Sequence, residues 1–419
     1  MSVSLDPSSL KSGFDYSVEL LKRLIEIPTV SPAGEHYEEA AELLAKELER
    51  LGFEVNVIRV PREYQESKCK YASRNPRFIV LGRRGEGPRL HFNGHYDVVP
   101  GGSGWTVTDP FRPLIKEGRL YGRGAIDMKG GIAAVMGAFK AIREEGLDVP
   151  LTLEAAFVPD EEIGGDCGTG YLLNALESPP EYVILPEPSG LNTPWHGHKG
   201  AVWVKVYVAG RNAHASTPWH GNNAFLNASR LALELQSLIS SKLAGKRTKH
   251  RIIPEEAGQP TASLGGVATV VGGGKTNQVP GEFMFTVDRR LIPEENTRDV
   301  LEELKSLVLW ASVKLGVESR VERELLMEPA INDPGPLYNA LRNSAKVYGI
   351  EVEEPTVCPG GLDMWYYTTR GSKALAYGPK GVLAHAPDEH IELVELEKLV
   401  SIFALLPFEL KKASQEALN

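Results

Sequence analysis

The chain has 419 residues, more than one ordinary hydrophobic core accommodates, so two domains are expected. Its apolar content of 42% and charged content of 24% are typical of a globular protein, and no apolar run reaches the roughly 18 residues that a membrane span requires. The net charge of -9, with no basic stripe to offset it, excludes a general nucleic-acid-binding protein.

The N-terminus and the cysteines bear on the cellular compartment. Residues 1–20 contain no apolar core and no cleavage pattern, so no export signal is predicted. The three cysteines, Cys69, Cys167 and Cys358, are odd in number and scattered, without the spacing of a metal site. A reducing, cytoplasmic setting is therefore expected.

The first part of the chain alternates between helical and strand patterns. In chain order the patterns predict helices at 14–27 and 36–52, strands at 54–60, 77–82 and 89–94, a helix at 129–145, and strands at 151–158 and 182–186. The polar stretch 62–77 is interpreted as a surface insertion, a solvated loop between strands. Strands that alternate with helices indicate an α/β sheet with helices on both faces.

The pattern changes near residue 199. The elements predicted there are an alternating strand at 200–210, a helix at 223–241, a glycine-rich strand region at 260–274, a strand at 282–291, a helix at 295–315 and a strand at 317–326. This order is typical of a ferredoxin-like α+β unit. Because helix 335–348 and strand 373–378 then return to the first pattern, an inserted domain at 199–326 is predicted. Residues 1–198 and 327–419 form the larger domain.

Polar side chains directly follow several of the predicted strands. His95 and Asp97 come after one strand, and Asp127 stands between a Gly-Arg-Gly turn and a helix. Since polar residues just beyond apolar strands are costly unless they bind something, these residues are candidate metal-site residues. Asp97 shares a face with His95, where it is able to accept the second ring N–H of a ligating histidine. A buried His–Asp pair without metal is the structural alternative.

An acidic cluster of Asp160, Glu161 and Glu162 follows another apolar strand. Adjacent carboxylates repel one another, and a cation is the simplest relief. Because neighbours on a turn point in different directions, one glutamate is able to bind metal while the other transfers protons. Glu187 adds a carboxylate at the end of the next strand. A solvated acidic turn is the alternative interpretation of the cluster.

The remaining candidates need to be separated from look-alike motifs. His385 and His390 compete for a ligand role, and their chemistry alone does not decide between them. Residues 122–127 (GRGAID) differ from a dinucleotide-binding fingerprint, because an aspartate stands where that motif has glycine or alanine. Residues 272–276 (GGGKT) are not a phosphate-binding loop, because Thr269 replaces its first glycine.

Two segments are highly specific: His-x-Asp-Val-Val-Pro at 95–100 and Gly-Arg-Gly-x-x-Asp-Met-Lys-Gly-Gly at 122–131. On these, the chain resembles over nearly its whole length the dinuclear-zinc amidohydrolase and carboxypeptidase family. That family includes acetylornithine deacetylase, succinyl-diaminopimelate desuccinylase, aminoacylase and bacterial glutamate carboxypeptidase. The resemblance implies a mixed-sheet α/β metallopeptidase catalytic domain with an inserted ferredoxin-like lid and dimerisation domain.

The resemblance also implies a ligand set for two metal ions, with one bridging carboxylate and two further ligands on each ion. The set consists of Asp127 as the bridge, His95 and Glu187 on the first ion, and Glu162 and His385 on the second. Glu161 corresponds to the general base, and Asp97 to the residue that orients His95. The family's C-terminal pattern, Ala-His-x-Pro-x-Glu, selects His385 over His390.

In the inserted domain, the resemblance implies residues that contact substrate. His214 corresponds to a lid histidine that stabilises the oxyanion, often in the site of the partner subunit. Asn277 and Arg290 correspond to positions that bind the substrate carboxylate, and Arg289 is not separated from Arg290 by the sequence.

The expected activity is the hydrolysis of an N-acyl amino acid, of the deacetylase or desuccinylase type, by a homodimer. A mixed histidine and carboxylate set suits zinc first, with cobalt or manganese as substitutes, and two such ions polarise a carbonyl and activate water. The alternatives are a metallocarboxypeptidase or dipeptidase, and a non-catalytic binding relative, against which the intact Glu161 argues.

Gly361 is a further substrate-binding candidate. Leu362 stands where many members of the family have threonine or serine, so a hydroxyl near the substrate is missing. The sequence therefore defines the reaction more closely than the substrate.

Overall fold

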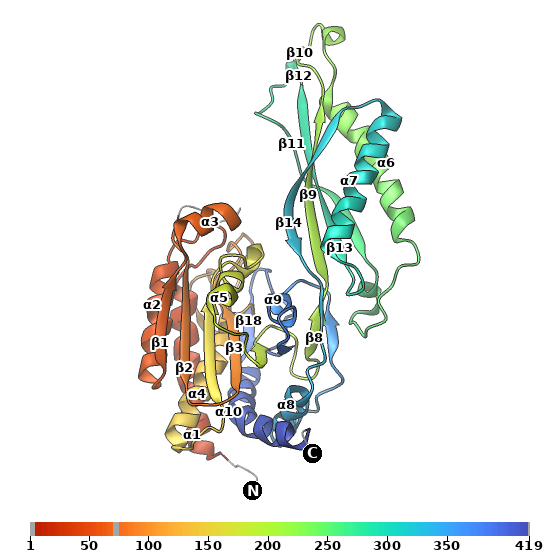
Figure 1. Ribbon diagram of the computed structural model, residues 1–419. Coiled ribbons are helices and arrows are strands. Elements are labelled where there is room, and N and C mark those ends of the chain that lie inside the picture. Colours follow the sequence, from red (N-terminus) through yellow and green to blue (C-terminus); the bar gives the residue numbers. More distant parts are fainter. Residues whose placement is uncertain (1–4, 70–74, 418–419) are drawn as a thin grey trace. The chain divides into compact units, whose positions relative to one another are not determined.

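The computed structural model describes residues 5–69 and 75–417 (Figure 1). The chain forms two compact units, each described by itself. Unit 1 consists of 1–196, 332–356 and 362–419, and unit 2 of 197–331 and 357–361.

Unit 1 is built on a mixed sheet whose strand order is β1-β2-β6-β3-β7-β17-β8. Its strands are β1 (Glu54–Arg59), β2 (Phe78–Arg84), β3 (Arg89–His95), β6 (Thr152–Val158), β7 (Tyr182–Leu185), β8 (Trp195–His198) and β17 (Lys373–Ala376). The central strands β6, β3, β7 and β17 pair in parallel, whereas β1, β2 and β8 pair antiparallel to their neighbours. Because the central strands are parallel, the residues that follow them come together at one edge of the sheet. Strand β8 also pairs with the short strand β16 (Thr356–Cys358) and, at residues that belong to unit 2, with β15 (Ala330–Ile331).

Helices cover both faces of this sheet, as predicted. The helices of unit 1 are α1 (Pro7–Glu26), α2 (Tyr37–Arg50), α3 (Arg62–Lys68), α4 (Lys129–Glu145), α5 (Thr169–Ala175), α8 (Pro336–Val347), α9 (Met364–Thr368) and α10 (Leu393–Glu416). Along β2, Phe78 and Val80 belong to the large core with α1, α2, α4, α8 and α10. Ile79 and Leu81 face the other way, into a smaller cluster with α5. This alternation is the period of two that a strand imposes.

Close packing of α1 on α4 depends on glycine. A Cβ atom at Gly13 would lie 2.5 Å from the backbone oxygen of Gly137, and a Cβ atom at Gly137 would lie 1.9 Å from Ser17 Oγ. These distances are far below ordinary van der Waals contact, so neither position accepts a larger residue without moving the helices apart. Since α4 starts two residues after Asp127, this packing contributes to the placement of that carboxylate.

Unit 1 also contains a separate, small three-stranded sheet. It has the order β18-β5-β4, with β18 (His390–Glu392), β5 (Arg119–Tyr121) and β4 (Leu114–Lys116). Because β18 pairs antiparallel with β5, the loop that precedes β18 and the turn that follows β5 are neighbours. These are the segments that contain His385 and Asp127.

Unit 2 has a four-stranded antiparallel sheet of order β11-β13-β9-β14 with two helices. Its elements are β9 (Gly200–Ala209), α6 (Ala224–Leu243), β11 (Thr261–Val270), β13 (Glu282–Leu291), α7 (Thr297–Leu315) and β14 (Ser319–Met327). The valines at alternate positions 202–208 of β9 are buried in a core with α6 and α7. A short ribbon of β10 (Ala213–His214) and β12 (Gln278–Val279) extends it. The strand–helix–strand–strand–helix–strand order predicted from the sequence is present.

The structure departs from the predictions at the polar stretch 62–77. Residues 62–68 form helix α3, Gln65, Cys69 and Arg77 are buried, and a disulfide joins Cys69 to Cys167. Positions 70–74 lie outside the described residues. The interpretation of a solvated loop is therefore wrong for the described ends of this stretch, and the spacing of the cysteines did not predict that two of them pair.

The first helix is longer than predicted. Helix α1 begins at Pro7 rather than at residue 14, because Asp6 caps it by accepting a hydrogen bond from the backbone N–H of Ser8 and because proline suits the first turn. Among residues 5–69 and 75–417, no helix has both the length and the apolar character needed to cross a membrane.

Candidate metal centre

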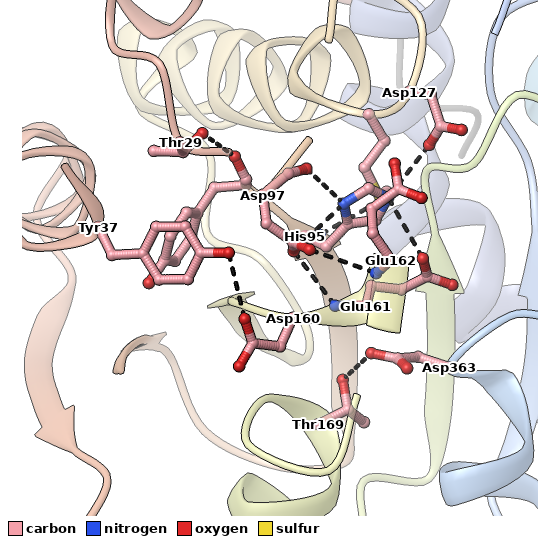
Figure 2. A network of polar contacts seen from close by, with 12 residues as sticks. Thr29, Tyr37, His95, Asp97, Asp127, Asp160, Glu161, Glu162, Thr169 and Asp363 are labelled. Atoms are coloured by element: carbon pink, nitrogen blue, oxygen red, sulfur yellow. Dashed lines mark hydrogen bonds and ion pairs between the residues drawn. The ribbon is translucent and has the colours of Figure 1, made fainter. Parts of the chain in front are cut away.

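Seven of the predicted site residues meet at the carboxyl edge of the parallel strands in unit 1. They are His95, Asp97, Asp127, Glu161, Glu162, Glu187 and His385. His95 ends β3, the Asp160–Glu162 turn follows β6, and Glu187 follows β7. Asp127 directly precedes the N-cap of α4, and His385 lies in the loop before β18. Figure 2 shows the side chains of Asp127, Glu161 and Glu162 gathered around the ring of His95.

Two groups of ligand atoms form around Asp127. His95, Asp127 and Glu187 make the first group, and Asp127, Glu162 and His385 make the second. Asp127 Oδ1 lies 3.1 Å from His95 Nε2, while its Oδ2 lies 3.3 Å from His385 Nε2. Glu162 Oε1 is 3.0 Å from His385 Nε2, and Glu187 Oε1 is 3.9 Å from His95 Nε2. Each oxygen of Asp127 thus faces a different histidine, which is the arrangement of a bridging carboxylate.

The spacing and chemistry of these atoms suit divalent cations. Ligand atoms at ~2.0–2.1 Å around a tetrahedral zinc ion are about 3.3 Å from one another, close to the separations on either side of Asp127. Nitrogen and carboxylate oxygen donors together suit zinc and its first-row neighbours. His390 belongs to neither group, because its Nδ1 lies 2.8 Å from the carbonyl oxygen of Asp388 and its Nε2 lies near Glu392.

The turn that carries Glu161 and Glu162 is held through its backbone. They form a short 3-10 turn after Asp160, whose φ of 65° is in the left-handed region. The backbone N–H groups of Glu161 and Glu162 donate to the two carboxylate oxygens of Asp97, each at 3.2 Å. Glu161 Oε2 lies 4.0 Å from His95 Nε2, and Glu161 belongs to neither group of candidate ligands.

Asp97 has a broader role than the sequence indicated. The Nδ1–H of His95 points to the backbone carbonyl oxygen of Asp97 at 3.0 Å, whereas the carboxylate Oδ1 is 3.6 Å away. The carboxylate instead accepts from the turn that carries Glu161 and Glu162. Asp97 therefore links the orientation of His95 to that of the two glutamates.

The electrostatics of the site reflect crowded, buried carboxylates. Burial, together with the charges of neighbouring carboxylates, raises the pKa of Glu161 well above its ordinary value and raises the pKa of Glu187 to about 8. Asp127 is the exception: burial opposes its ionisation, but hydrogen bonds from His385 and His95 hold its pKa below the usual range. Hydrogen bonds from His385 to Asp127 and to Glu162 raise the pKa of His385 to about 10. Such an excess of buried negative charge is the environment that bound cations stabilise.

Several supporting residues were not singled out from the sequence. Glu389 accepts from the backbone N–H groups of Ile126 and Asp127, and it pairs with Arg123 at 2.6 Å. Arg123 in turn donates to the backbone oxygen of His385. Arg123 and Glu389 both belong to the recognised motifs, so the sequence pointed to each of them. The motifs do not reveal that the two side chains pair.

Two further buried groups complete the surroundings of the site. Lys129 donates to the backbone oxygens of Leu24 and Ile27 at the end of α1, which attaches the start of α4 to that helix. Asp363 is buried and accepts from Thr169 Oγ1 at 2.5 Å, and burial raises its pKa to about 7. Asp363 ends the segment GGLD at 360–363, where many members of the resembled family have Gly-Gly-Thr-Asp or Gly-Gly-Ser-Asp, but no role near the ligands was assigned to it from the sequence.

His214 and Asn277 lie side by side in unit 2. The ribbon of β10 and β12 pairs His214 with Gln278, and the N–H of Ala215 donates to the backbone oxygen of Asn277 at 2.9 Å. The backbone N–H of Ser216 donates to His214 Nδ1 at 3.1 Å. In the neutral ring that bond places the proton on Nε2, so the exposed histidine presents an N–H donor.

Arg290 is at the other end of the same sheet. Arg290 pairs with Ala201 in the register of β13 and β9, whereas Glu282 pairs with Ala209, the end that leads to His214. Extended strand between positions 201 and 209 spans about 26 Å. Asn277 and Arg290 of one chain are therefore too far apart to bind one small carboxylate together, so a shared role would need them from two chains and stays a prediction.

The two adjacent arginines differ in what they already bind. Arg289 is 1% exposed, and its guanidinium pairs with Glu295 at 2.6 Å. Arg290 is partly exposed, pairs with Asp288 and lies over the ring of Trp203. Of the two, Arg290 is the one whose guanidinium reaches the surface.

Gly361 has a structural reason for lacking a side chain. A Cβ atom there would lie 2.0 Å from Met327 Sδ within unit 2. Leu362, which follows it, is buried. A larger residue at 361 would thus displace the flexible end of the Met327 side chain, and the Gly361 backbone stays a candidate for contact with substrate.

The chain is similar to known proteins over most of its length. The model of peptidase family M20/M25/M40 matches residues 91–408. A succinyl-diaminopimelate desuccinylase from Hahella chejuensis is 28% identical over 419 residues, covering 97% of this chain and 99% of the relative. An uncharacterized metallohydrolase from Methanocaldococcus jannaschii is 27% identical, covering 92% and 97%.

Solved structures share the fold at lower identity. Human carnosine dipeptidase 1 superimposes with a TM-score of 0.74 at 19% identity, covering 96% of this chain and all of that one (100%). The metallo-carboxypeptidase Sso-CP2 from Sulfolobus solfataricus gives a TM-score of 0.73 at 21% identity, covering 94% and 99%.

Proposed function

Because the chain belongs to peptidase family M20/M25/M40, a family of hydrolases acting on peptide and amide bonds, we propose that it hydrolyses the amide bond of an N-acyl amino acid. The products would be a carboxylic acid and a free amino acid. The observation that carries the proposal is Asp127, whose two oxygens face two different histidines beside a glutamate that is not a ligand. The desuccinylases at 27% and 28% identity support an N-acyl substrate over a peptide.

The residues of the two ligand groups would hold one divalent ion each, with Asp127 shared between them. Zinc fits the donors best, and cobalt or manganese are substitutes. When bound, two such ions polarise the amide carbonyl and lower the pKa of a water molecule.

Glu161 is the proposed general base. Its carboxylate is beside the ligands, and its backbone is held by Asp97, so it accepts the proton of the attacking water and passes it to the amine nitrogen that leaves. Burial raises the pKa of Glu161, and a carboxylate with a raised pKa accepts a proton more readily than an ordinary glutamate. An amide at this position would keep the shape of the site and lose the proton transfer.

Residues 199–326 are proposed as a lid and dimerisation domain. His214 would donate its Nε2–H to the oxyanion, and Arg290 would bind the substrate carboxylate through two N–H groups. Since His214 and Arg290 of one chain are at opposite ends of a sheet, a small substrate contacted by both would need them from two chains. This supports a homodimer in which His214 acts in the site of the partner subunit.

A panel of substrates tests the proposal. Protein reconstituted with zinc or cobalt is assayed on N-acetyl amino acids, N-succinyl amino acids and dipeptides, with the Glu161→Gln variant as the matched control. Hydrolysis of one or more N-acyl amino acids by the wild type alone is expected. Turnover confined to dipeptides would favour the metallocarboxypeptidase or dipeptidase alternative. No turnover of any amide by fully loaded protein would contradict catalysis and favour a binding relative.

A cytoplasmic location remains our proposal from the sequence. Disulfides are uncommon in reducing compartments, and the Cys69–Cys167 bond stands against that expectation. Both cysteines are buried, at 7% and 0% exposure, which limits access of reductants to the sulfur atoms. Thiol labelling of protein taken directly from its source, before and after reduction, decides whether the bond forms there.

A further inference from the structure

The turn that carries Glu161 and Glu162 is also held by an ion pair outside the two recognised motifs. Arg77 Nε donates to Asp160 Oδ2 at 2.7 Å, and both side chains are almost completely buried, at 0% and 2% exposure. The other Asp160 oxygen accepts from the hydroxyl of Tyr37 at 3.1 Å, a contact visible in Figure 2. Asp160 is the residue whose left-handed backbone starts the turn.

Arg77 is itself fixed by further contacts. Its Nη1 donates to the backbone oxygen of Asn75 at 2.8 Å, and its Nη2 donates to the backbone oxygen of Pro32 at 2.7 Å. The guanidinium also lies 5.1 Å from the centre of the Tyr37 ring. A planar group with donors in three directions is thus used to place one carboxylate, which a lysine is not able to reproduce fully.

A second attachment reaches the same segment from α3. The disulfide joins Cys69, at the end of α3, to Cys167, five residues after Glu162. Within that segment, the N–H groups of Gly165 and Gly168 donate to the backbone oxygens of Asp160 and Gly165. Residues 159–168 are therefore tied covalently at one end and by a buried ion pair at the other. Both attachments come from the two described ends of the stretch 62–77.

We propose that Arg77 and the Cys69–Cys167 disulfide are positioning elements for the turn that carries Glu161 and Glu162. The inference rests on the proposed function, in which Glu161 transfers protons and Glu162 binds metal. Asp97 holds the backbone of the turn at Glu161 and Glu162, and Arg77 holds it through Asp160. Neither Arg77 nor the disulfide touches the reacting atoms, so their effect passes through the geometry of the turn.

Hydrogen exchange of a peptide covering 159–168 measures this effect without metal or substrate. Arg77→Met should make this segment exchange at least ~10-fold faster, as expected when a hydrogen bond to a charged group is lost. Arg77→Lys should restore part of the protection. The Cys69→Ala/Cys167→Ala double variant should also raise exchange in this segment. Unchanged exchange in Arg77→Met would overturn the proposal.

The chain offers a matched control in β2, the strand that begins directly after Arg77. Arg83 also pairs with a buried carboxylate, that of Glu154, but on a part of β2 that leads away from the turn. Arg83→Met should leave exchange at 159–168 as in the wild type. Equal effects of Arg77→Met and Arg83→Met would show general destabilisation and overturn a positioning role. If Arg77→Met fails to fold, Asp160→Asn removes the same charge pair while keeping the shape of the side chain.

Kinetics separate positioning from stability. Displacing a catalytic group by about 1 Å costs up to ~10²-fold in rate, so folded Arg77→Met should lose ~10-fold or more in kcat with KM within ~2-fold of wild type. Unchanged kcat despite faster exchange would overturn the positioning role. If wild-type protein hydrolyses no amide and binds no metal, the proposed function fails, whereas the exchange experiment still decides whether Arg77 holds the turn.

Discussion

Mixing two inactive variants tests whether a complete site draws on two chains. His214→Ala removes the proposed oxyanion donor and should lower kcat by ~10²–10³, the usual loss for one such donor. Glu161→Gln removes the proposed base and should lower kcat by at least ~10². Neither residue belongs to a ligand group, so both variants should bind metal as the wild type does.

The magnitude of the recovery follows from the distance within one chain. Since about 26 Å of strand separates the Arg290 end of unit 2 from the end that leads to His214, one substrate is not able to contact both from a single chain. In a two-fold dimer each site would then take Glu161 from one chain and His214 from the other. Random re-association of equal amounts makes about half of the dimers mixed, and each mixed dimer has one intact site of two. Activity should therefore recover to about a quarter of the wild-type value.

The assay needs proof that subunits exchange. Chains with different tags are mixed, re-associated and purified through both tags, and the activity of the mixed dimer is compared with that of each parent variant. Purified mixed dimers should reach about half of the wild-type activity per dimer. Mixed dimers with no more activity than the parents would refute the two-chain arrangement, and a protein that is monomeric at assay concentration would refute it as well.

Three further outcomes are expected. His385→Ala should reduce the metal content measured by elemental analysis from about two ions per chain to about one, because the group around His95 stays complete; two retained ions would contradict the ligand assignment. Converting the α-carboxylate of the best substrate to a methyl ester should lower kcat/KM by ~10² or more, because the donors of Arg290 lose their acceptor; equal rates would exclude that role. Burial lowers the pKa of His198 to about 4 from 6.5, so in that window the unfolded chain binds a proton that the folded chain does not, and stability falls as the pH drops. Between pH 7.5 and pH 5 the wild type should lose about 2 kcal/mol more than His198→Gln in denaturant unfolding, and equal losses would disprove this origin.

Much of this protein was determined by local sequence. Strand periodicity located β1, β9 and β13 to within a residue or two, and the helix from Lys129 to Glu145 was predicted at its observed bounds. Apolar strands that end in histidine or carboxylate marked His95, Glu161 and Glu162 as candidates, whereas His385 was chosen over His390 only by the family resemblance. The reason is physical: buried parallel strands have continuous apolar runs, and polar residues at their ends have few uses other than binding.

Other features depended on contacts between segments far apart in the chain. Three contacts join residues that no local pattern relates. They are the contact of Asp127 with His95, the bond from the Glu161 N–H to the Asp97 carboxylate, and the ion pair of Arg77 with Asp160. The disulfide between Cys69 and Cys167 spans 98 positions, and nothing in their spacing distinguishes this pair from one involving Cys358. Strand register likewise separated Arg290 from Asn277, and burial separated Arg289 from Arg290. Periodicity reports which face of an element is buried, but which elements meet is set by chain topology and packing, and these decide where a side chain finds its partner.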